Sequence, residues 1–403
     1  MKRTVLFVDD EPNVLMGLKR LLRPLREGWE FHFATSGKEA LEIMDRVAFD
    51  AVVSDMRMPG MDGPEFLTRV MRHHPDVIRF ALSGFSDQEM VGRSISPTHQ
   101  YLTKPCDSGV LIAALEQAIG ARDLVTNQTI LRKIARIEHL PALPEAYRRI
   151  TEELAKGDPA PRLVGEIVAR DVGLSANILK LVNSAYFGLS RHVTDPHQAV
   201  IVLGVDLIRS LILSLHVFQS FGAGETRSFS LPLLWNHCLR TSAIARALAE
   251  AGRHSKSVAD MACTSALLHD LGKLILDIRC PEECEAIYRV VREQNRRVAD
   301  VEQELLGVTH AQVGGYLLGL WGLPGQVVRA VAAHHDPVPP ENADALTDML
   351  HFANFLEHET FVFNEQYTRP QIHPAWLARI GGEDGLTAWR GVVADLGLAL
   401  EDE

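Results

Sequence analysis

Cysteine is scarce in this sequence, with five residues in a chain of 403 and no Cys-x-x-Cys spacing. Disulfide-stapled secreted domains are dense in cysteine, and thiolate zinc sites need closely paired cysteines. Both classes are therefore excluded. Cys280 and Cys284 have the spacing of one helix face, and we expect them to point into a core rather than toward a metal.

Long hydrophobic runs are also lacking. The most apolar stretch, residues 199–218, is interrupted by Asp206 and Arg209, whereas a membrane span needs about 18 or more consecutive apolar residues. At the N-terminus a short apolar run ends at Asp9, too soon for the roughly 7–15-residue core of a signal peptide. We therefore expect no membrane span and a cytoplasmic location.

A surplus of basic charge is missing as well. The net charge is −11 at pH 7, and residues 336–403 hold 13 acidic but only three basic side chains. Binding to nucleic-acid phosphates needs a concentrated cationic face, and no segment supplies one. Direct nucleic-acid binding is therefore disfavoured. The composition is otherwise ordinary, with 46% hydrophobic and 23% charged residues, and the length predicts two or three folded domains.

The first 125 residues alternate between short apolar runs and helical patterns. Apolar runs predict strands at 5–8, 31–34, 51–53, 77–82 and 101–102, and periodic patterns predict helices at 14–25, 40–47, 65–73 and 108–120. Strands that are apolar throughout and separated by helices form a parallel sheet covered on both faces. We therefore predict an α/β doubly wound, parallel five-stranded sheet, which places functional groups at the carboxyl ends of its strands.

Polar groups follow these predicted strands. Asp9 and Asp10 follow the first strand, Asp55 the third, Ser83 the fourth and Lys104 the fifth. Three gathered carboxylates repel one another unless a divalent cation lies among them, and oxygen ligands suit Mg²⁺. A lysine and a hydroxyl nearby would hold phosphoryl oxygens. A single carboxylate could merely cap a helix, but the whole set favours a functional site.

Four motifs in this region carry a family resemblance: Val8-Asp9-Asp10, Ser54-Asp55-Met56-Arg57-Met58-Pro59-Gly60, Ser83-Gly84 and Tyr101-Leu102-Thr103-Lys104-Pro105. Together they resemble the receiver domain of bacterial response regulators, over about residues 1–122. A flavodoxin-like receiver fold, the fold of CheY, is what this resemblance implies.

The resemblance also implies the roles of individual residues. Asp55 would accept a phosphoryl group from a sensor histidine kinase. Mg²⁺ would be bound by Asp9, Asp10, Asp55 and the backbone carbonyl of Arg57. Ser83 and Lys104 would contact the acyl phosphate, and Tyr101 would be the aromatic switch. The Lys104-Pro105 bond would be cis.

A helical pattern runs from Asp107 to about residue 137 and stops at His139-Leu140-Pro141-Ala142-Leu143-Pro144. We therefore predict a helical linker at 123–138. Beyond Pro144 the apolar residues recur at helical spacing and no strand run stands out. This predicts an all-α domain at 139–340, with 341–403 as its acidic helical C-terminal extension.

Histidines are the chemically distinctive residues of the second region. They are His237, His269, His310, His334 and His335, joined by Asp270 directly after His269. The His269-Asp270 pair lies in an apolar sequence, where burial without partners costs several kcal/mol. We expect the six side chains to converge. Imidazoles and a carboxylate from separate helices suit Zn²⁺, Mn²⁺ or Fe, and a hydrogen-bonded structural network is the alternative.

The second region resembles the HDOD domain, a signalling relative of the HD-domain phosphohydrolases, over about residues 137–340. The resemblance rests on Leu140-Pro141-Ala142-Leu143-Pro144, Asp171, residues 178–188, Leu268-His269-Asp270-Leu271-Gly272-Lys273, Glu304, His310-Ala311, Trp321-Gly322-Leu323-Pro324 and His334-His335. The second half also resembles the HD-GYP phosphodiesterases of cyclic di-GMP. It lacks their Gly-Tyr-Pro triplet, and the nearest match to their late metal-binding aspartate is Asn354, a weaker ligand.

These resemblances imply a two-component response regulator in which phosphorylation of Asp55 controls a non-catalytic HDOD signalling or interaction domain. Its partners would be a sensor histidine kinase, a downstream signalling protein and a second copy of the chain. The alternative is a receiver-regulated, metal-dependent HD-type phosphohydrolase acting on cyclic di-GMP or another nucleotide.

Overall fold

The computed structural model of this chain describes residues 2–83, 97–104, 106–135, 144–155, 157, 160–184, 193–220, 228–361 and 371–398. The chain forms two compact units. The first unit is Met1–Ala142 with Tyr316–Leu323, and the second unit is Leu143–Gly315 with Pro324–Glu403.

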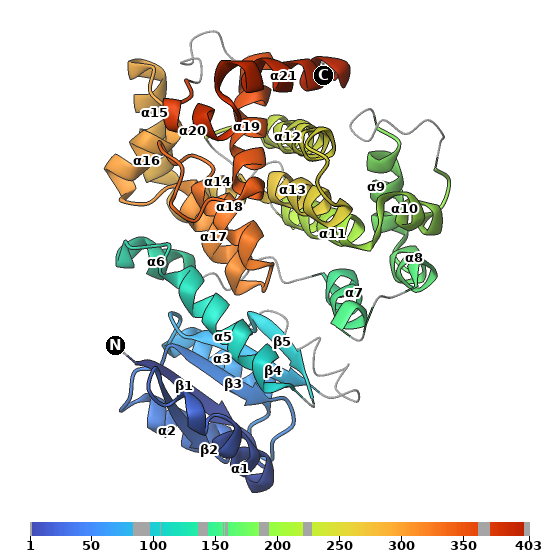
Figure 1. The fold of residues 1–403 in the computed structure, drawn as a ribbon. Coiled ribbons are helices and arrows are strands. Elements are labelled where there is room, and N and C mark those ends of the chain that lie inside the picture. The colour runs from blue at the N-terminus through green and yellow to red at the C-terminus, as the bar shows by residue number, and fades with distance from the viewer. Residues whose placement is uncertain are drawn as a thin grey trace. The chain divides into compact units, whose positions relative to one another are not determined.

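A five-stranded parallel sheet forms the centre of the first unit (Figure 1), as the alternating pattern predicts. Its strands are β1 Arg3–Val8, β2 Trp29–Ala34, β3 Ala51–Asp55, β4 Ile78–Ser83 and β5 Gln100–Thr103, in the order β2-β1-β3-β4-β5. The middle strand β3 is buried along its whole length. Because β1 and β3 are neighbours, their carboxyl ends meet at the centre of one sheet edge.

Helices flank the sheet: α1 Pro12–Leu21, α2 Gly37–Met44, α3 Gly63–His73 and α5 Ser108–Arg122, with a short 3-10 turn η1 at Arg23–Leu25. Local sequence sets where they begin. Pro12 starts α1, a position that needs no backbone donor. The side chains of Ser36, Asp62 and Asp107 accept hydrogen bonds from the free amides of α2, α3 and α5.

The helical stretch expected from Asp107 to about residue 137 is interrupted. Helix α5 ends at Arg122, and α6 spans Gln128–Ala135. Asn127 causes the new start, because its side-chain oxygen accepts from the amides of Thr129 and Ile130 at 2.9 and 3.3 Å. In the described part of the expected linker, residues 123–138, there is thus one helix, α6, which is separate from α5.

The second unit is helical throughout its described residues, as the periodicity predicts. Its first helices are α7 Glu145–Ala155, α8 Pro161–Ala169, α9 Val172–Val182, α10 Pro196–Leu203 and α11 Val205–Ser220. The next are α12 Leu231–Ala251, α13 Lys256–Leu268, α14 Leu271–Arg279, α15 Pro281–Gln294 and α16 Val298–Leu306. The last are α17 His310–Leu320, α18 Gly325–Ala333, α19 Ala345–Thr360, α20 Pro374–Arg379 and α21 Gly382–Asp395. Within α17, the residues up to Gly315 belong to this unit.

Helix α19 is part of the core of the second unit, although it lies in the segment expected to be an extension. It packs against α12, α13 and α18, and most of its residues are buried. Cys280 and Cys284 are buried, which confirms that they point into the core.

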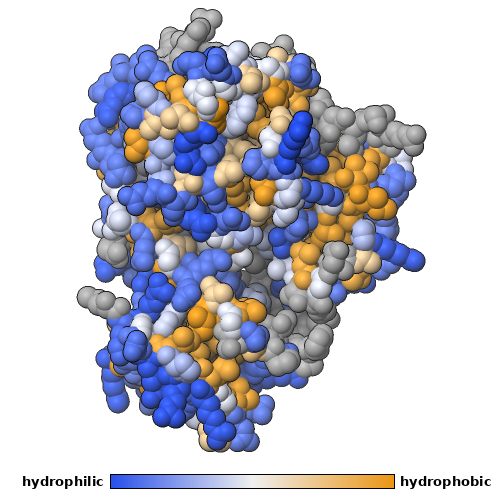
Figure 2. Space-filling view, in the orientation of Figure 1, coloured by the Kyte–Doolittle hydropathy of each residue, from blue (hydrophilic) through white to orange (hydrophobic). Residues whose placement is uncertain are grey.

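Apolar side chains also gather on the surface near α9 and α10 (Figure 2), where Val172, Ile201 and Val202 are exposed.

In the part of the chain that the structure describes, no single helix has the length and apolar character to cross a membrane. One pair of helices, Pro196–Leu203 and Val205–Phe218, has this length and apolar character when the two are taken together. The chain bends by 117° at the break between them.

Candidate functional site

Two acidic side chains of the first unit lie next to each other at the carboxyl edge of the sheet. Val8 of β1 pairs in register with Ser54 of β3, so Asp9 and Asp55 follow at neighbouring positions. Both are buried. The ammonium of Lys104 lies 2.8 Å from Asp9 Oδ2 and forms an ion pair with Asp55. The backbone amide of Arg57 donates to Asp55 Oδ2 at 3.1 Å.

Electrostatics at this edge favour a cation. Burial raises the pKa of Asp55, the nearby charge of Asp9 adds to that effect, and Lys104 opposes it. Burial disfavours the charge of Lys104, but its hydrogen bonds to Asp55 and Asp9 outweigh burial and raise its pKa. One ammonium therefore serves two carboxylates, which is the local charge pattern that a divalent cation with oxygen ligands also fits.

The remaining predicted residues of the first unit are only partly placed. Asp10 is half-buried directly after Asp9, and Tyr101 is half-buried against the core of the unit. Ser83 ends β4, but its side chain, like Gly84 and Pro105, lies outside the described residues. The cis assignment of Pro105 thus stays a prediction.

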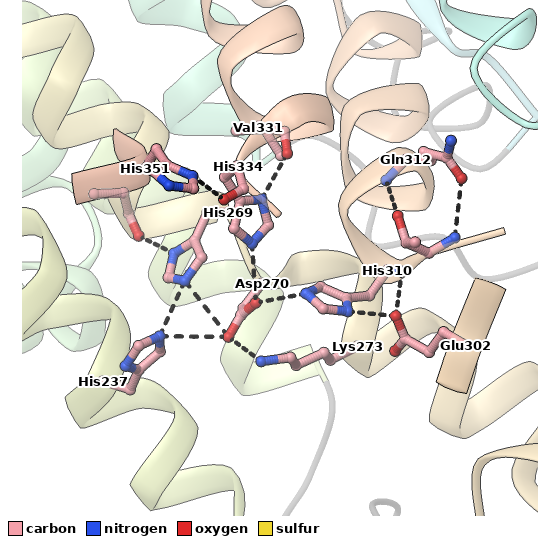
Figure 3. Close-up of polar contacts among 12 residues, drawn as sticks. His237, His269, Asp270, Lys273, Glu302, His310, Gln312, Val331, His334 and His351 are labelled. Carbon is pink, nitrogen blue, oxygen red and sulfur yellow. Dashed lines mark hydrogen bonds and ion pairs between the residues drawn. The ribbon is translucent and has the colours of Figure 1, made fainter. Parts of the chain in front are cut away.

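Five helices of the second unit bring the predicted histidines together (Figure 3). His237 comes from the middle of α12, and His269 and Asp270 form the junction between α13 and α14. His310 begins α17, while His334 and His335 follow the end of α18. His237, His269, His310, His334 and Asp270 are at least 96% buried. The expectation that these side chains converge is met.

Each of the four buried histidines uses its Nδ1 atom for an outward contact. His269 and His334 donate to the carbonyl oxygens of Ala266 and Val331, both at 2.7 Å. The Nδ1 atoms of His237 and His310 lie 2.6 Å from the carboxylates of Glu357 and Glu302. Because a carbonyl or a carboxylate only accepts, the proton of each neutral ring is on Nδ1.

The Nε2 atoms of the same histidines all face Asp270. Their distances to its carboxylate oxygens are 3.6 Å for His237, 3.5 Å for His269, 3.2 Å for His310 and 3.8 Å for His334. The ammonium of Lys273 lies 2.6 Å from Asp270 Oδ2. The centre of the cluster is thus one carboxylate surrounded by imidazole nitrogens, with one lysine at its side (Figure 3).

The ammonium of Lys273 donates to Asp270 Oδ2, but several other polar atoms at the centre of the cluster lack a donor. His237 Nε2 and His269 Nε2 are 3.0 Å apart, although both are acceptors when Nδ1 holds the proton. Two nitrogen ligands of one tetrahedral metal ion are about 3.3 Å apart. No hydrogen bond of good geometry reaches His310 Nε2, His334 Nε2 or Asp270 Oδ1. Buried acceptors that face one another without donors fit a metal cation.

Three sets of described residues offer ligand atoms that all lie within 4.8 Å of one another: Asp270, His310, His334 and His335; His237, His269 and Asp270; and His237, Glu357 and His358. Two of them share Asp270 and two share His237. The residues present are therefore a nitrogen-rich donor set of the kind that suits Zn²⁺, Mn²⁺ or Fe.

The charge states of Asp270, His269 and His334 agree with this donor set, whereas that of His310 does not. Burial acts against the ionised form of Asp270, but the surrounding histidines and Lys273 outweigh it and hold its pKa well below the usual range. Burial lowers the pKa values of His269 and His334, which favours neutral imidazoles. Burial also acts on His310, but the carboxylate of Glu302 outweighs it and raises the pKa of that ring.

Two carboxylates of the site were not expected from the sequence. Glu302 of α16 accepts from both the backbone amide and the ring of His310, and Glu357 of α19 contacts His237. The resemblance drew attention to Glu304 instead, which is exposed and pairs with Arg296 at 2.7 Å. Asn354 is buried one turn before Glu357. In the sequence, Glu357 is marked only by the two apolar residues before it, Phe355 and Leu356, and this pattern does not say that it meets His237.

Comparison with protein families gives two matches along the chain. A model described as the response regulator receiver domain matches residues 5–116, and one described as the HDOD domain matches residues 140–337. The solved structure of an HDOD domain protein with unknown function from Geobacter sulfurreducens covers 64% of this chain and 94% of that chain. Its TM-score is 0.51 at 24% identity, which supports the fold.

Curated relatives match parts of the chain. A protein of Treponema pallidum is 30% identical over 233 residues, which is 56% of this chain and 44% of that protein. The hydrogenase transcriptional regulatory protein HoxA of Cupriavidus necator is 31% identical over 159 residues, 39% of this chain and 32% of HoxA. The sensor kinase CckA of Brucella abortus is 36% identical over 124 residues, 30% of this chain and 13% of CckA. The chain thus spans less than half of the length of each.

Proposed function

Since the chain carries a response regulator receiver domain followed by an HDOD domain, we propose that it is a two-component response regulator whose receiver controls the HDOD domain as its output. In this proposal Asp55 is the phosphoacceptor and a sensor histidine kinase is the phosphodonor. Mg²⁺ is bound by Asp9, Asp10, Asp55 and the carbonyl of Arg57. Ser83 and Lys104 contact the acyl phosphate, and Tyr101 responds to it.

The observation that carries this proposal is the placement of Lys104 between Asp9 and Asp55. A phosphoryl group on Asp55 carries about 1.5 to 2 negative charges, which take the place of the single charge of the carboxylate beside that ammonium. Lys104 would then exchange a carboxylate partner for a phosphoryl partner. This exchange would move Lys104 and, with it, the end of β5 and the segment that follows. Mg²⁺, when bound, neutralises the acidic oxygens and orients the phosphodonor.

Labelling with radioactive acetyl phosphate and Mg²⁺ tests the phosphoacceptor. The wild type should take up one phosphoryl group per chain, and Asp55→Asn should take up none. Asp62→Asn is the matched control, because Asp62 lies in the following loop and caps α3 with an oxygen that asparagine retains. Equal labelling of the wild type and Asp55→Asn would refute the assignment.

The output domain acts, in this proposal, by binding rather than by catalysis. The HDOD domain would bind a downstream signalling protein or a second copy of the chain, and phosphorylation of Asp55 would change this binding. Asn354 supports this view, since an amide there replaces the charged ligand of the cyclic di-GMP phosphodiesterases that the sequence resembles.

We expect weak or no hydrolysis of cyclic di-GMP by the purified protein with Mn²⁺ or Fe. Robust turnover would overturn the non-catalytic proposal.

A second candidate function is a metal-dependent phosphohydrolase, and a specific observation favours it: four buried imidazoles direct their Nε2 atoms at Asp270, and no hydrogen bond of good geometry reaches those of His310 and His334. The residues that would hold a metal are His237, His269, Asp270, His310 and His334, with His335 beside them. A bound Zn²⁺, Mn²⁺ or Fe would supply Lewis acidity and an activated water. Lys273 would stay on Asp270 and face an anionic substrate.

Metal analysis of the purified full chain separates the two candidates. Stoichiometric Zn, Mn or Fe that is lost in His269→Ala supports a metal site at the cluster. His254→Ala is the matched control, because His254 is exposed and outside the cluster. If the wild type binds none of these metals after loading, the phosphohydrolase candidate fails and the cluster is a structural network.

A further inference from the structure

Glu357 is a fully buried carboxylate on α19 and lies beyond residue 337, where the HDOD match ends. A buried carboxylate is costly unless its charge is paired and its oxygens are hydrogen-bonded. Here both oxygens are used. Oε2 lies 2.6 Å from His237 Nδ1, and Oε1 accepts from Arg240 Nε at 2.7 Å.

Arg240 is held on its other side as well, because its guanidinium lies over the ring of Phe361, 4.5 Å from the ring centroid. Arg240 and His237 are one turn apart on α12, so both face the same segment of α19. The carboxylate of Glu357 is therefore a fixed acceptor directed at one nitrogen of His237.

We propose that Glu357 is a positioning residue of a cation site at the histidine cluster: its carboxylate keeps the proton of His237 on Nδ1, so that Nε2 presents a bare lone pair toward His269 and Asp270. This inference rests on the metal-binding candidate described above. Carboxylates that orient metal-bound histidines in this way typically change metal affinity about 10–100-fold when they are removed.

Arg240 makes the proposal sharply testable through Glu357→Gln. Arginine only donates, so it takes the amide oxygen of the new glutamine and turns the amide NH₂ toward His237. His237 Nδ1 must then accept, which moves the proton to Nε2 and removes the lone pair from the centre of the cluster. The variant keeps the size of the side chain and changes the tautomer of one histidine.

The first measurement uses nitrogen-15 NMR of histidine rings in the metal-free full chain. We expect the His237 resonances, identified by their loss in His237→Gln, to show the Nδ1–H tautomer in the wild type and the Nε2–H tautomer in Glu357→Gln. The matched control is Glu359→Gln, which makes the same chemical change on α19 at an exposed pair with Arg390. An unchanged His237 tautomer in Glu357→Gln would overturn the proposal.

The second measurement is titration of the same proteins with Co²⁺, followed by visible absorption of the bound ion. Glu357→Gln should bind about 10–100-fold more weakly than the wild type, and Glu359→Gln should bind equally well. Adding Arg240→Met to Glu357→Gln should restore most of the affinity, because the amide oxygen can then turn back to His237. A loss of affinity caused only by a weakened fold would not recover in this way.

The outcomes distinguish the claim that the cluster binds a metal from the claim that Glu357 positions His237. If the wild type binds no Co²⁺ at the cluster, the metal-binding candidate fails and the positioning role with it. If the wild type binds Co²⁺ and Glu357→Gln binds it equally tightly, the metal site stands and only the role of Glu357 is overturned. If the double variant binds no better than Glu357→Gln, the tautomer explanation is overturned.

Discussion

Asp55 is held where its ionised form is unfavourable. Burial raises its pKa, with the charge of Asp9 adding to the effect and Lys104 opposing it. The folded protein therefore keeps the proton of Asp55 to a higher pH than the unfolded chain does. The stability from this group is fully present below the ordinary pKa of 3.8 and is lost as the pH rises through the raised folded value.

We therefore predict that Asp55→Asn is more stable than the wild type at neutral pH, because asparagine removes a buried charge whose cationic partner, Lys104, is shared with Asp9. The melting temperature of the first unit should rise by a few degrees at pH 7, and the gain should disappear below about pH 4. Thermal unfolding of both full-length proteins across this range checks it. A variant that melts at or below the wild-type temperature at pH 7 would contradict the prediction.

Individual site residues differ in how far the sequence could reveal them. Asp9, Asp55 and Lys104 could be predicted because parallel strands bring their carboxyl ends to one edge. Glu302 and Glu357 could not, because nothing in a helical pattern says which buried glutamate will meet a histidine from another helix. Choosing Glu304 over Glu302 moves the carboxylate about 200° around a helix, from the site to the surface.

At the scale of elements, Gly272 fixes how closely α14 and α17 approach. A Cβ atom at this position would lie 1.9 Å from the backbone oxygen of His310 and 2.8 Å from the amide of Gly314. Both contacts are with backbone atoms, which cannot rotate out of the way. The glycine in His269-Asp270-Leu271-Gly272-Lys273 therefore lets the start of α17 bring His310 to Asp270.

Gly272→Ala should force the two helices apart, lower the stability of the second unit by about 1–3 kcal/mol and weaken metal binding at the cluster. Gly391→Ala in α21 is the matched control, because nothing lies within 4 Å of its added Cβ. That variant should gain about 0.5–1 kcal/mol from helix propensity. Chemical unfolding of the three proteins measures both effects. Equal stability of Gly272→Ala and the wild type would show that the approach of α14 to α17 is less constrained than the structure indicates.

Element boundaries show a further limit of sequence patterns. The apolar spacing from Asp107 onward continues across the interruption between Arg122 and Gln128, so periodicity alone predicts one helix. The side chain of Asn127 decides the outcome locally. Helix α19 is a similar case, because the sequence predicts residues 341–403 only as an acidic helical extension, while the burial of its apolar side chains and of Glu357 places it in the core.

At the scale of the whole molecule, the proposed function requires that phosphorylation of Asp55 be transmitted from the first unit to the second. Lys104 is the cation that contacts both acidic partners, and it lies a few residues before α5, the helix that leads through α6 toward the second unit. A charge change at Asp55 therefore acts first on Lys104, between β5 and α5, which both precede α6 in the chain. This arrangement favours Lys104 as the sensor and Asp55 as the switch.

Lys104→Ala should separate phosphorylation from its consequence. Asp55 should still be labelled by acetyl phosphate with Mg²⁺, because the carboxylate remains in place and Lys104 donates no atom to the transfer. In the wild type, phosphorylation should change the rate of proteolytic cleavage between Asp107 and Ala135, and in Lys104→Ala this change should be lost because no ammonium responds to the added charge. Lys38→Ala, at an exposed position of α2, should label and respond like the wild type. If Lys104→Ala keeps the full phosphorylation-dependent change, another group senses the phosphoryl charge and the proposed route through β5 and α5 is wrong.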